Sequence, residues 1–167
     1  KKDHINIVLN QQVEPEPSSY DKYRLPYKAL PEIDMAKIYM ESQLLGKKLS
    51  FPFIISSMTG GLEKGGTINQ NLAIAAQEEK VALGLGSMRV IIKHPETLSS
   101  FQVRKLCPNI PLFANVGIVQ LNYGFGLDEL QKIISCVEAD ALFLHINHLH
   151  EAAQPEGDTN FENLLDK

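Results

Sequence analysis

The sequence predicts an α/β protein built on a parallel β-sheet. Three observations carry this prediction: four short apolar runs are typical of buried strands, a helix-like segment follows each run, and polar or glycine residues gather where each run ends. Such a sheet is either open and doubly wound or closed into a barrel, and the commonest barrel needs about eight strand–helix units.

The size and charge of the chain limit which classes of partner it can have. It has 167 residues, 16 Lys and Arg against 20 Asp and Glu, a formal net charge of −4, and 44% apolar residues. One globular domain is expected at this length. Because no long basic tract is present, nucleic-acid and membrane-surface roles are disfavoured, and a small-molecule partner is favoured. Without an apolar run of about 18 residues or a signal-like start, we expect a cytoplasmic protein.

The first fifty residues, 1–50, predict an extended N-terminal arm. Ile5, Ile7 and Leu9 alternate with polar residues, which indicates a short strand or hairpin arm. Prolines then exclude a long helix over the following stretch, because each removes a backbone donor. They are Pro15, Pro17, Pro26 and Pro31. Lys47 and Lys48 are expected to form a solvated surface pair.

The rest of the chain repeats one pattern four times. The expected strands are 53–58, 81–86, 111–117 and 141–147. The expected helices are 67–80, 95–106, 127–137 and a last one that starts near residue 160. In the first helix, one side is expected to carry Ile68, Leu72, Ala75 and Ala76. Cys107 and Cys136 lack the spacing of a thiolate metal site and are expected to be reduced, buried thiols.

Polar and glycine residues cluster at the carboxyl end of each expected strand. The four clusters are 57–61, 86–89, 115–117 and 145–151. Parallel sheets and barrels both bind ligands at this edge, so we expect the functional site there.

The first cluster contains Met58, Thr59, Gly60 and Gly61. A hydroxyl beside two glycines lets a phosphate or the edge of a flavin ring approach backbone N–H groups. A tight turn between strand and helix explains the same residues without a ligand. The loop alone therefore leaves both interpretations open.

Arg89 follows the second expected strand, and Asn115 lies near the end of the third. An arginine in this place either clamps a phosphate or bridges to a carboxylate elsewhere in the domain. Ser87 would face the same way as Arg89 in an extended segment and add a hydroxyl. Asn115 can bind the edge of a heterocycle or satisfy a loop backbone.

The fourth cluster, 145–151, is the richest in polar side chains. His145 and Asn147 are two residues apart and would share one face of a strand. A dedicated zinc site made of histidines is disfavoured, because it needs several ligands in fixed geometry. A single carboxylate, Glu151, that bridges through Mg²⁺ to a substrate phosphate is favoured, because Mg²⁺ keeps most of its waters.

Taken together, the motifs resemble a known family, the type 2 isopentenyl diphosphate isomerases, which are FMN-dependent TIM barrels. The motifs that carry the resemblance are residues 29–32, 57–61, 86–89, 114–117, 145–151 and 154–158. It implies a TIM (β/α)8 barrel, of which this chain would cover about the N-terminal four βα units. It also implies the interconversion of isopentenyl and dimethylallyl diphosphate with reduced FMN, Mg²⁺ and NADPH as the flavin reductant.

The resemblance also implies roles for individual residues. The implied FMN contacts are Ser57, Met58, Thr59, Ser87 and Asn115. The implied substrate contacts are Lys1, Ser87, Met88, Arg89, His145, Asn147 and His150. Asn147 and His150 would line the reacting end, and Glu151 would bind Mg²⁺. Two positions depart from the family, since His150 and Met88 both replace a more usual glutamine, and an imidazole, unlike an amide, titrates near neutral pH.

The domain organisation implied is an extended arm, 1–50, followed by the N-terminal half of a barrel, 51–167, with the C-terminal half absent. We therefore expect a fragment, a truncated product or the ordered part of a longer protein. Half a barrel leaves unpaired sheet edges, which favours a homo-oligomer. Two alternatives stay open: another FMN-dependent TIM-barrel oxidoreductase, and an inactive half-barrel fragment.

Overall fold

The computed structural model describes residues 2–13 and 19–167, and its contacts divide the chain into two units, Lys1–Tyr39 and Met40–Lys167. In the first unit, the helix α1, Lys2–Asn10, replaces the strand expected at 5–9. That prediction is wrong because Ile5, Val8 and Leu9 are also spaced three and four residues apart, as on one helix face, and the two-residue alternation was too short to decide.

The described remainder of the first unit is largely irregular. It contains two short 3₁₀ turns, η1 (Ser19–Lys22) and η2 (Met35–Lys37), in agreement with the effect expected of the prolines. Asp34 caps η2, because its Oδ1 accepts a hydrogen bond of 3.0 Å from the backbone N–H of Ala36.

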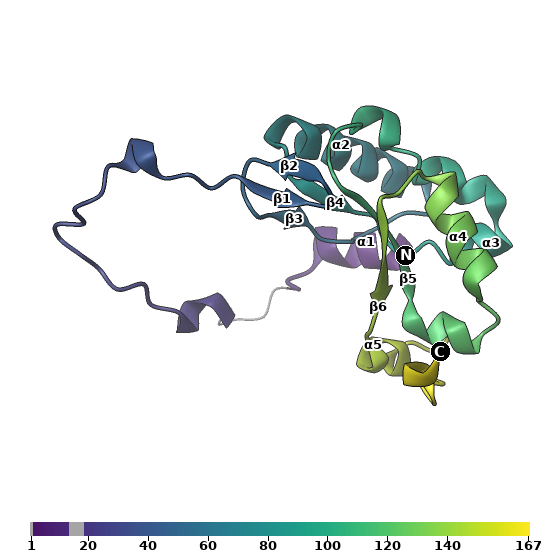
Figure 1. Ribbon diagram of the computed structural model, residues 1–167. Helices are drawn as coiled ribbons and strands as arrows, with labels where there is room; N and C mark the ends of the chain where they lie inside the picture. Colours follow the sequence, from purple (N-terminus) through teal and green to yellow (C-terminus); the bar gives the residue numbers. More distant parts are fainter. Residues whose placement is uncertain (1, 14–18) are drawn as a thin grey trace. The chain divides into compact units, whose positions relative to one another are not determined.

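The second unit contains two β-sheets (Figure 1). The hairpin β1–β2 is antiparallel and turns through Leu45 and Gly46, which both have positive φ, the backbone that short hairpin turns require. Its strands are β1 (Ser42–Leu44) and β2 (Lys47–Leu49). The larger sheet is parallel, with the order β3-β4-β5-β6. Its strands are β3 (Ile54–Ile55), β4 (Ala82–Gly84), β5 (Leu112–Gly117) and β6 (Ala141–His145).

The predicted TIM (β/α)8 barrel is wrong for this structure. The described residues form an open four-stranded parallel sheet and a separate two-stranded antiparallel sheet. Within them, β3 pairs only with β4 and β6 pairs only with β5, so the sheet has two edges and does not close. Runs of strand and helix are common to open and closed parallel sheets, which is why the pattern did not discriminate.

Helices and 3₁₀ turns connect the strands, and none of those in the described residues is both long and apolar enough to cross a membrane. The α-helices are α2 (Glu63–Glu79), α3 (Val90–Lys93), α4 (Leu127–Cys136) and α5 (His148–Ala153). The 3₁₀ turns are η3 (Pro95–Ser100), η4 (Arg104–Leu106), η5 (Ile118–Asn122) and η6 (Leu164–Asp166).

Two of the expected helices are absent from these positions. The segment 95–106 forms η3 and η4 instead of one helix, because the break between them sends Phe101 and Val103 into the core. The helix expected near residue 160 is replaced by an extended segment that ends in η6, where Asn163 adopts a left-handed conformation. The helix α5 follows the end of the expected strand 141–147, in a segment for which no helix was predicted (Figure 1).

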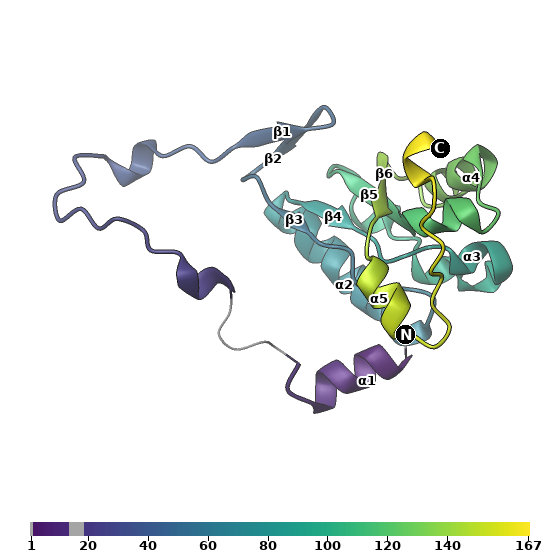
Figure 2. The same ribbon diagram turned by 90° about the horizontal axis from the view of Figure 1, so that it is seen from below.

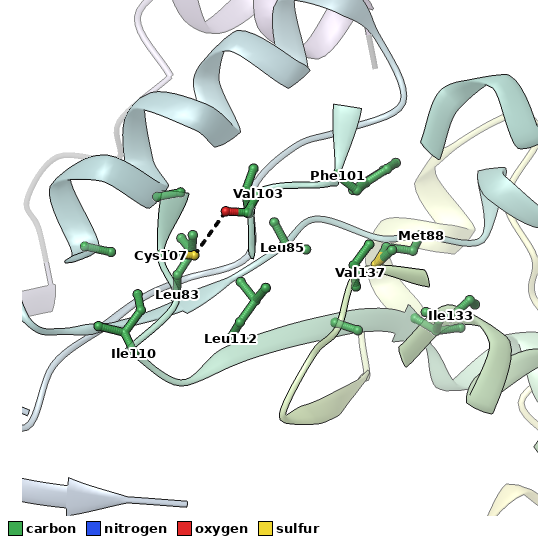
Figure 3. Packing of buried hydrophobic residues seen from close by; sticks show 14 of the residues in the cluster. Leu83, Leu85, Met88, Phe101, Val103, Cys107, Ile110, Leu112, Ile133 and Val137 are labelled. Atoms are coloured by element: carbon green, nitrogen blue, oxygen red, sulfur yellow. Dashed lines mark hydrogen bonds between the residues drawn. The ribbon is translucent and has the colours of Figure 1, made fainter. Parts of the chain in front are cut away.

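The main core lies between the parallel sheet and the helices α2 and α4 (Figures 2 and 3). Leu83 and Leu85 of the β4 region and Leu112 and Val116 of β5 are fully buried in it. On the opposite face, Phe113 stacks on Phe143 with ring centroids 4.4 Å apart. A smaller cluster there holds Leu49 of the hairpin with Ala82 and Phe113. The hairpin thus covers part of the face that the helices leave open.

Helix α2 packs through much of the predicted face. Ala76 is buried, Leu72 packs against the core and Ile68 is half-buried, as expected, whereas Ala75 is exposed. The helix also buries residues that were not predicted, which are Gly65, Gly66, Asn69 and Ala73. Gly66 belongs to the buried face because a Cβ on it would lie 3.2 Å from Cα of Ser100, so only a bare backbone approaches η3 this closely.

Lys47 is not the solvated surface residue that the sequence predicted. Its Nζ donates a hydrogen bond of 2.9 Å to the carbonyl oxygen of Ile110, and 25% of its side chain is exposed. The prediction fails because it considered only the neighbour Lys48, while the partners of Lys47 lie 63 or more residues away in the sequence.

Candidate functional site

The loops that follow β3 and β4 meet each other and the end of β5 through hydrogen bonds at the carboxyl edge of the sheet. The backbone N–H of Gly86 donates to Thr59 O at 3.2 Å, and that of Met88 donates to Asn115 O at 2.8 Å. The Nδ2 of Asn115, a side chain that is 4% exposed, donates to Ser57 Oγ at 3.1 Å. Positions far apart in the sequence are therefore neighbours here, as expected of strand ends in a parallel sheet.

The glycines of these loops allow close contacts within the chain. A Cβ on Gly60 would lie 1.9 Å from a ring carbon of Phe101, and a Cβ on Gly86 would lie 2.5 Å from Thr59 O. Both contacts are far inside van der Waals distance. Packing within the chain thus explains both Gly60 and Gly86. For Gly60 this agrees with the interpretation without a ligand that the sequence left open.

A buried asparagine of α2 holds the loop after β3, which contains Gly60 and Gly61, in place. The Nδ2 of Asn69 donates to Thr59 O at 3.2 Å and to Ser100 O at 2.9 Å, and Ser100 Oγ accepts the backbone N–H of Gly61 at 2.8 Å. Asn69 is 3% exposed and lies on the buried face of α2. The loop after β3 is therefore held by hydrogen bonds to side chains of α2 and η3.

The two methionines named as candidate ligand contacts lie in opposite environments. Met58 is 61% exposed, so its thioether is accessible at the edge. Met88 is fully buried and lies beside Ile133 and Val137 in the core (Figure 3). Only the backbone of Met88 takes part in the edge network, through its bond to Asn115 O.

Arg89 forms an ion pair with Asp158. The Nη1 of Arg89 donates to Asp158 Oδ2, and the Nε2 of Gln120 donates to the same oxygen at 2.7 Å. Arg89 follows β4, Gln120 lies in η5 after β5, and Asp158 comes after α5. Of the two interpretations of Arg89, the structure shows the bridge to a carboxylate, with 39% of the Arg89 side chain exposed.

Glu151 connects to the same group of residues. Its Oε2 accepts a hydrogen bond of 2.9 Å from the backbone N–H of Asp158. Gly157 packs against the backbone of Glu151, since a Cβ there would lie 1.8 Å from Glu151 O. The segment that carries Asp158 is thus bound to α5 on one side and to Arg89 and Gln120 on the other.

The remaining candidates lie around the start of α5. Asn147 caps this helix, because its Oδ1 accepts the backbone N–H of His150 at 3.0 Å. His145 ends β6 and pairs with Gly117 of β5, and both His145 and His150 are exposed. His148 contacts the ring of Phe161 edge-on. Asn147 therefore has a structural task that the strand prediction did not foresee.

The candidates fall into two neighbouring groups. Ser57, Thr59, Met88 and Asn115 share the first network, and Arg89 and Glu151 share the second through Asp158. Ser87 lies in the connecting segment between Gly86 and Met88. Lys1, named as a substrate contact, lies outside the described residues.

A cleft of about 410 Å³ lies between the start of α2 and η3, next to the loop after β3. Its lining includes Gly61 of that loop together with Glu63, Gln70, Glu96 and Thr97. Two carboxylates at its wall disfavour an anionic ligand there.

The described side chains at the carboxyl edge of the sheet do not form a metal site in which the protein supplies all the ligands. In residues 2–13 and 19–167, no group of three or more His, Cys, Asp or Glu side chains could together hold a metal ion. Cys107 and Cys136 are free thiols, and burial raises the pKa of Cys107, although Arg104 and Lys47 act to lower it. A buried thiol held in its neutral form is not suited to nucleophilic chemistry.

Sequence reasoning assigned no role to Gln120, Asp158 or Asn69. Asp158 belongs to the motif 154–158, one of those that carry the resemblance, and Gln120 is a lone polar residue among Ile118, Val119 and Leu121. An isolated polar residue in an apolar run is a usable signal, because a buried amide must find a partner. Its partner could not be read from the sequence.

Comparison with curated proteins finds relatives that match the whole chain. A protein named isopentenyl-diphosphate delta-isomerase from Nostoc sp. is 52% identical over 169 aligned residues, which cover 100% of this chain and 48% of the relative. Proteins of the same name from Hydrogenovibrio crunogenus and Rickettsia prowazekii are 47% and 48% identical and are covered to 49%. The chain thus spans about half the length of the curated relatives it matches.

These findings correct the resemblance stated from the sequence. The names of the relatives give the isomerase reaction but no type and no flavin. No family model matches the chain. The assignment to the type 2 family is therefore replaced by a likeness to proteins named isopentenyl-diphosphate delta-isomerase.

Proposed function

We propose that this chain contributes the site of an isomerase that interconverts isopentenyl and dimethylallyl diphosphate. The observation that carries the proposal is that all of the chain aligns, at 52% identity, with a relative named for this reaction. The reaction adds a proton at one carbon of an alkene and removes one from another. A protein that performs it must bind the diphosphate, position the alkene and hold protons near it.

Arg89 is the proposed ligand of the diphosphate. It lies at the carboxyl edge of the sheet and exposes 39% of its side chain, and a guanidinium matches phosphate oxygens with two parallel donors. Its ion pair with Asp158 uses Nη1 alone. His145, exposed at the end of β6, and Ser87 are the proposed further contacts of the substrate.

Glu151 is the proposed ligand of Mg²⁺. One half-buried carboxylate without a surrounding group of other ligands does not fit a closed zinc site, and it fits a Mg²⁺ ion that is held mainly by waters and by a substrate diphosphate. The bond from Asp158 N–H occupies one lone pair of Oε2 and fixes the carboxylate. Glu151 would thereby orient the phosphate end of the substrate.

Ser57, Met58, Thr59, Ser87 and Asn115 are the proposed residues for reduced FMN. Their fit rests on the hydrogen bond that joins Ser57 and Asn115, on the neighbouring Thr59 backbone, and on the accessible thioether of Met58. When bound, reduced FMN would supply the acid–base chemistry of the reaction, and NADPH would keep it reduced. The amide of Asn147 and the imidazole of His150 would line the reacting end, where His150 can hold a proton.

The experiment that tests the proposal follows isopentenyl diphosphate by proton NMR in D₂O. We expect the chain, with Mg²⁺ and FMN reduced by NADPH, to form dimethylallyl diphosphate and to incorporate deuterium. Arg89→Ala should weaken substrate binding strongly and flavin binding less. Oxidised FMN serves as the control. A parent chain that binds neither FMN nor substrate contradicts the proposal. The proposal further includes that the protein forms a homo-oligomer and is located in the cytoplasm.

A further inference from the structure

Asp158 is a carboxylate placed directly against the proposed diphosphate ligand. A negative charge at this position is unexpected, since by charge alone it repels a diphosphate. We propose that Asp158 is a positioning residue that holds the guanidinium of Arg89 in the orientation that receives the diphosphate. This inference rests on the proposed function and adds a residue to it.

The geometry leaves Arg89 able to bind both partners at once. Asp158 engages only Nη1, and within residues 2–13 and 19–167 the Nε and Nη2 groups of Arg89 donate no hydrogen bond. A guanidinium is a rigid fork with five donors, so fixing one corner also fixes the direction of the opposite edge. Asp158 can therefore orient the edge of Arg89 that remains for phosphate oxygens.

The carboxylate of Asp158 is itself held in place. Gln120, which is 5% exposed, donates to the same oxygen at 2.7 Å. The backbone N–H of Asp158 donates to Glu151 Oε2 at 2.9 Å, and that of Gly157 donates to Gln154 O at 3.1 Å. A fixed carboxylate can hold a long, flexible arginine, whereas a mobile one cannot.

The chain beyond Asp158 is bound to η5 as well. The Nδ2 of Asn122 donates to the carbonyl oxygens of Asn160 and Glu162, each at 2.9 Å, and the backbone N–H of Asn160 donates to the Tyr123 hydroxyl at 3.2 Å. Asp158 is thus fixed between α5 and η5, at the same edge of the sheet as Arg89.

Three roles for Asp158 predict different outcomes for Asp158→Asn. A positioning role predicts weaker diphosphate binding, because Arg89 loses its orientation. A competing anion predicts tighter binding, because a negative charge disappears. A purely structural role predicts a lower melting temperature with unchanged affinity. The direction of the change in affinity therefore separates them.

The experiment measures the binding of inorganic pyrophosphate and of isopentenyl diphosphate, each with Mg²⁺, by calorimetry. We expect Asp158→Asn to raise Kd about tenfold. An arginine released from Asp158 regains rotamer freedom and must lose it again when it binds the diphosphate, and the entropy of this loss corresponds to a change in Kd of about this size. Glu156→Gln is the matched control, since it removes one negative charge from an exposed residue of the same segment. We expect it to leave Kd within about twofold.

A double-mutant cycle tests whether Asp158 acts through Arg89. In the Arg89→Ala background, Asp158→Asn should change Kd no further, because the residue to be positioned is absent. If Asp158→Asn fails to fold, Gln120→Met replaces it in the cycle, because this variant keeps the Asp158 carboxylate but removes the hydrogen bond that holds it. We expect Gln120→Met to raise Kd by a smaller factor, and to have no effect in the Arg89→Ala background. Melting curves and the NMR signal of the Arg89 Nε–H report folding and orientation independently.

Unchanged or lower Kd for Asp158→Asn overturns the inference, and so does an equal effect with and without Arg89. Failure of the proposed function looks different. In that case the parent chain itself binds neither pyrophosphate nor isopentenyl diphosphate, and both proposals fall together. Binding by the parent with no effect of Asp158→Asn removes the inference alone.

Discussion

The Nζ of Lys47 lies 2.7 Å from Oδ1 of Asp140, a residue 93 positions later in the chain. The other oxygen of Asp140 accepts hydrogen bonds from Arg104 at 2.7 Å and from the backbone N–H of Leu112 at 2.8 Å. One carboxylate thus connects the hairpin β1–β2, the start of β5 and the segment before β6. Its side chain is only 24% exposed, so these bonds are partly shielded from water.

Replacing Asp140 with alanine should destabilise the second unit by about 2 kcal/mol, because Lys47 and Arg104 then keep their charges without the partner that compensates their burial. Urea unfolding followed by circular dichroism measures the change. The control is Glu78→Ala, an exposed carboxylate on α2, which should stay within about 0.5 kcal/mol of the parent. Equal effects of the two substitutions would show that the connection contributes little.

Asp140 should also make stability depend on pH. Burial raises the pKa of its carboxyl, but hydrogen bonds from Lys47, Leu112 and Arg104 lower it by more, so the pKa lies below its ordinary value of 3.8. Since the folded pKa is the lower one, the stabilisation is present above 3.8 and is lost as the pH falls through the folded pKa. The difference in unfolding free energy between parent and Asp140→Asn should therefore shrink in acid. A constant difference from neutral to acid pH would contradict this assignment.

Gly86→Ala should destabilise the chain by about 2 kcal/mol and weaken the proposed binding of FMN, because the new Cβ overlaps the backbone of Thr59 and pushes the loop after β3 aside. Thermal melts and FMN fluorescence titrations measure the two effects. Gly117→Ala is the matched control, since its Cβ would meet Val119 at an ordinary 3.7 Å and its φ of −63° suits alanine. If both variants melt alike, the close approach is not the cause.

Glu151→Gln should weaken the binding of Mg²⁺ in the presence of pyrophosphate by about tenfold or more, because a neutral amide is a poorer ligand than a carboxylate. The amide oxygen can still accept the bond from Asp158 N–H, so the fold should persist. Mg²⁺ titrations with pyrophosphate, and with Glu156→Gln as the control of equal charge, measure the change. Identical titration curves for parent and Glu151→Gln would remove this residue from the metal role.

Much of the local structure could be predicted because it depends on neighbouring residues. The apolar runs predicted strands at four places where the structure has β3 to β6, although β3 is only two residues long. The helix expected at 127–137 is α4, Leu127–Cys136. The segments that failed, 5–9 and 95–106, are those where the pattern was short or where burial of distant side chains decided the conformation.

The sequence predicted where the candidate site lies, but not which residues bind one another within it. Strand ends of a parallel sheet share one edge, so Ser57, Arg89 and Asn115 could be expected near one another before any partner was known. The partner of Arg89 could not, since Asp158 lies 69 residues away and reaches it only after α5 turns the chain back.

By itself, the sequence determined what its periodicity encodes: where apolar residues recur, where the four strands of the parallel sheet and the helices α2 and α4 lie, and that polar residues gather at the strand ends. The tertiary structure alone decided that the sheet is open, that Lys47 is tied to Asp140, and that Arg89 is paired with Asp158. The physical reason is the sequence separation over which each kind of interaction acts. Periodicity reports each residue's preference for burial, whereas ion pairs and hydrogen bonds depend on distances that exist only after distant segments have packed.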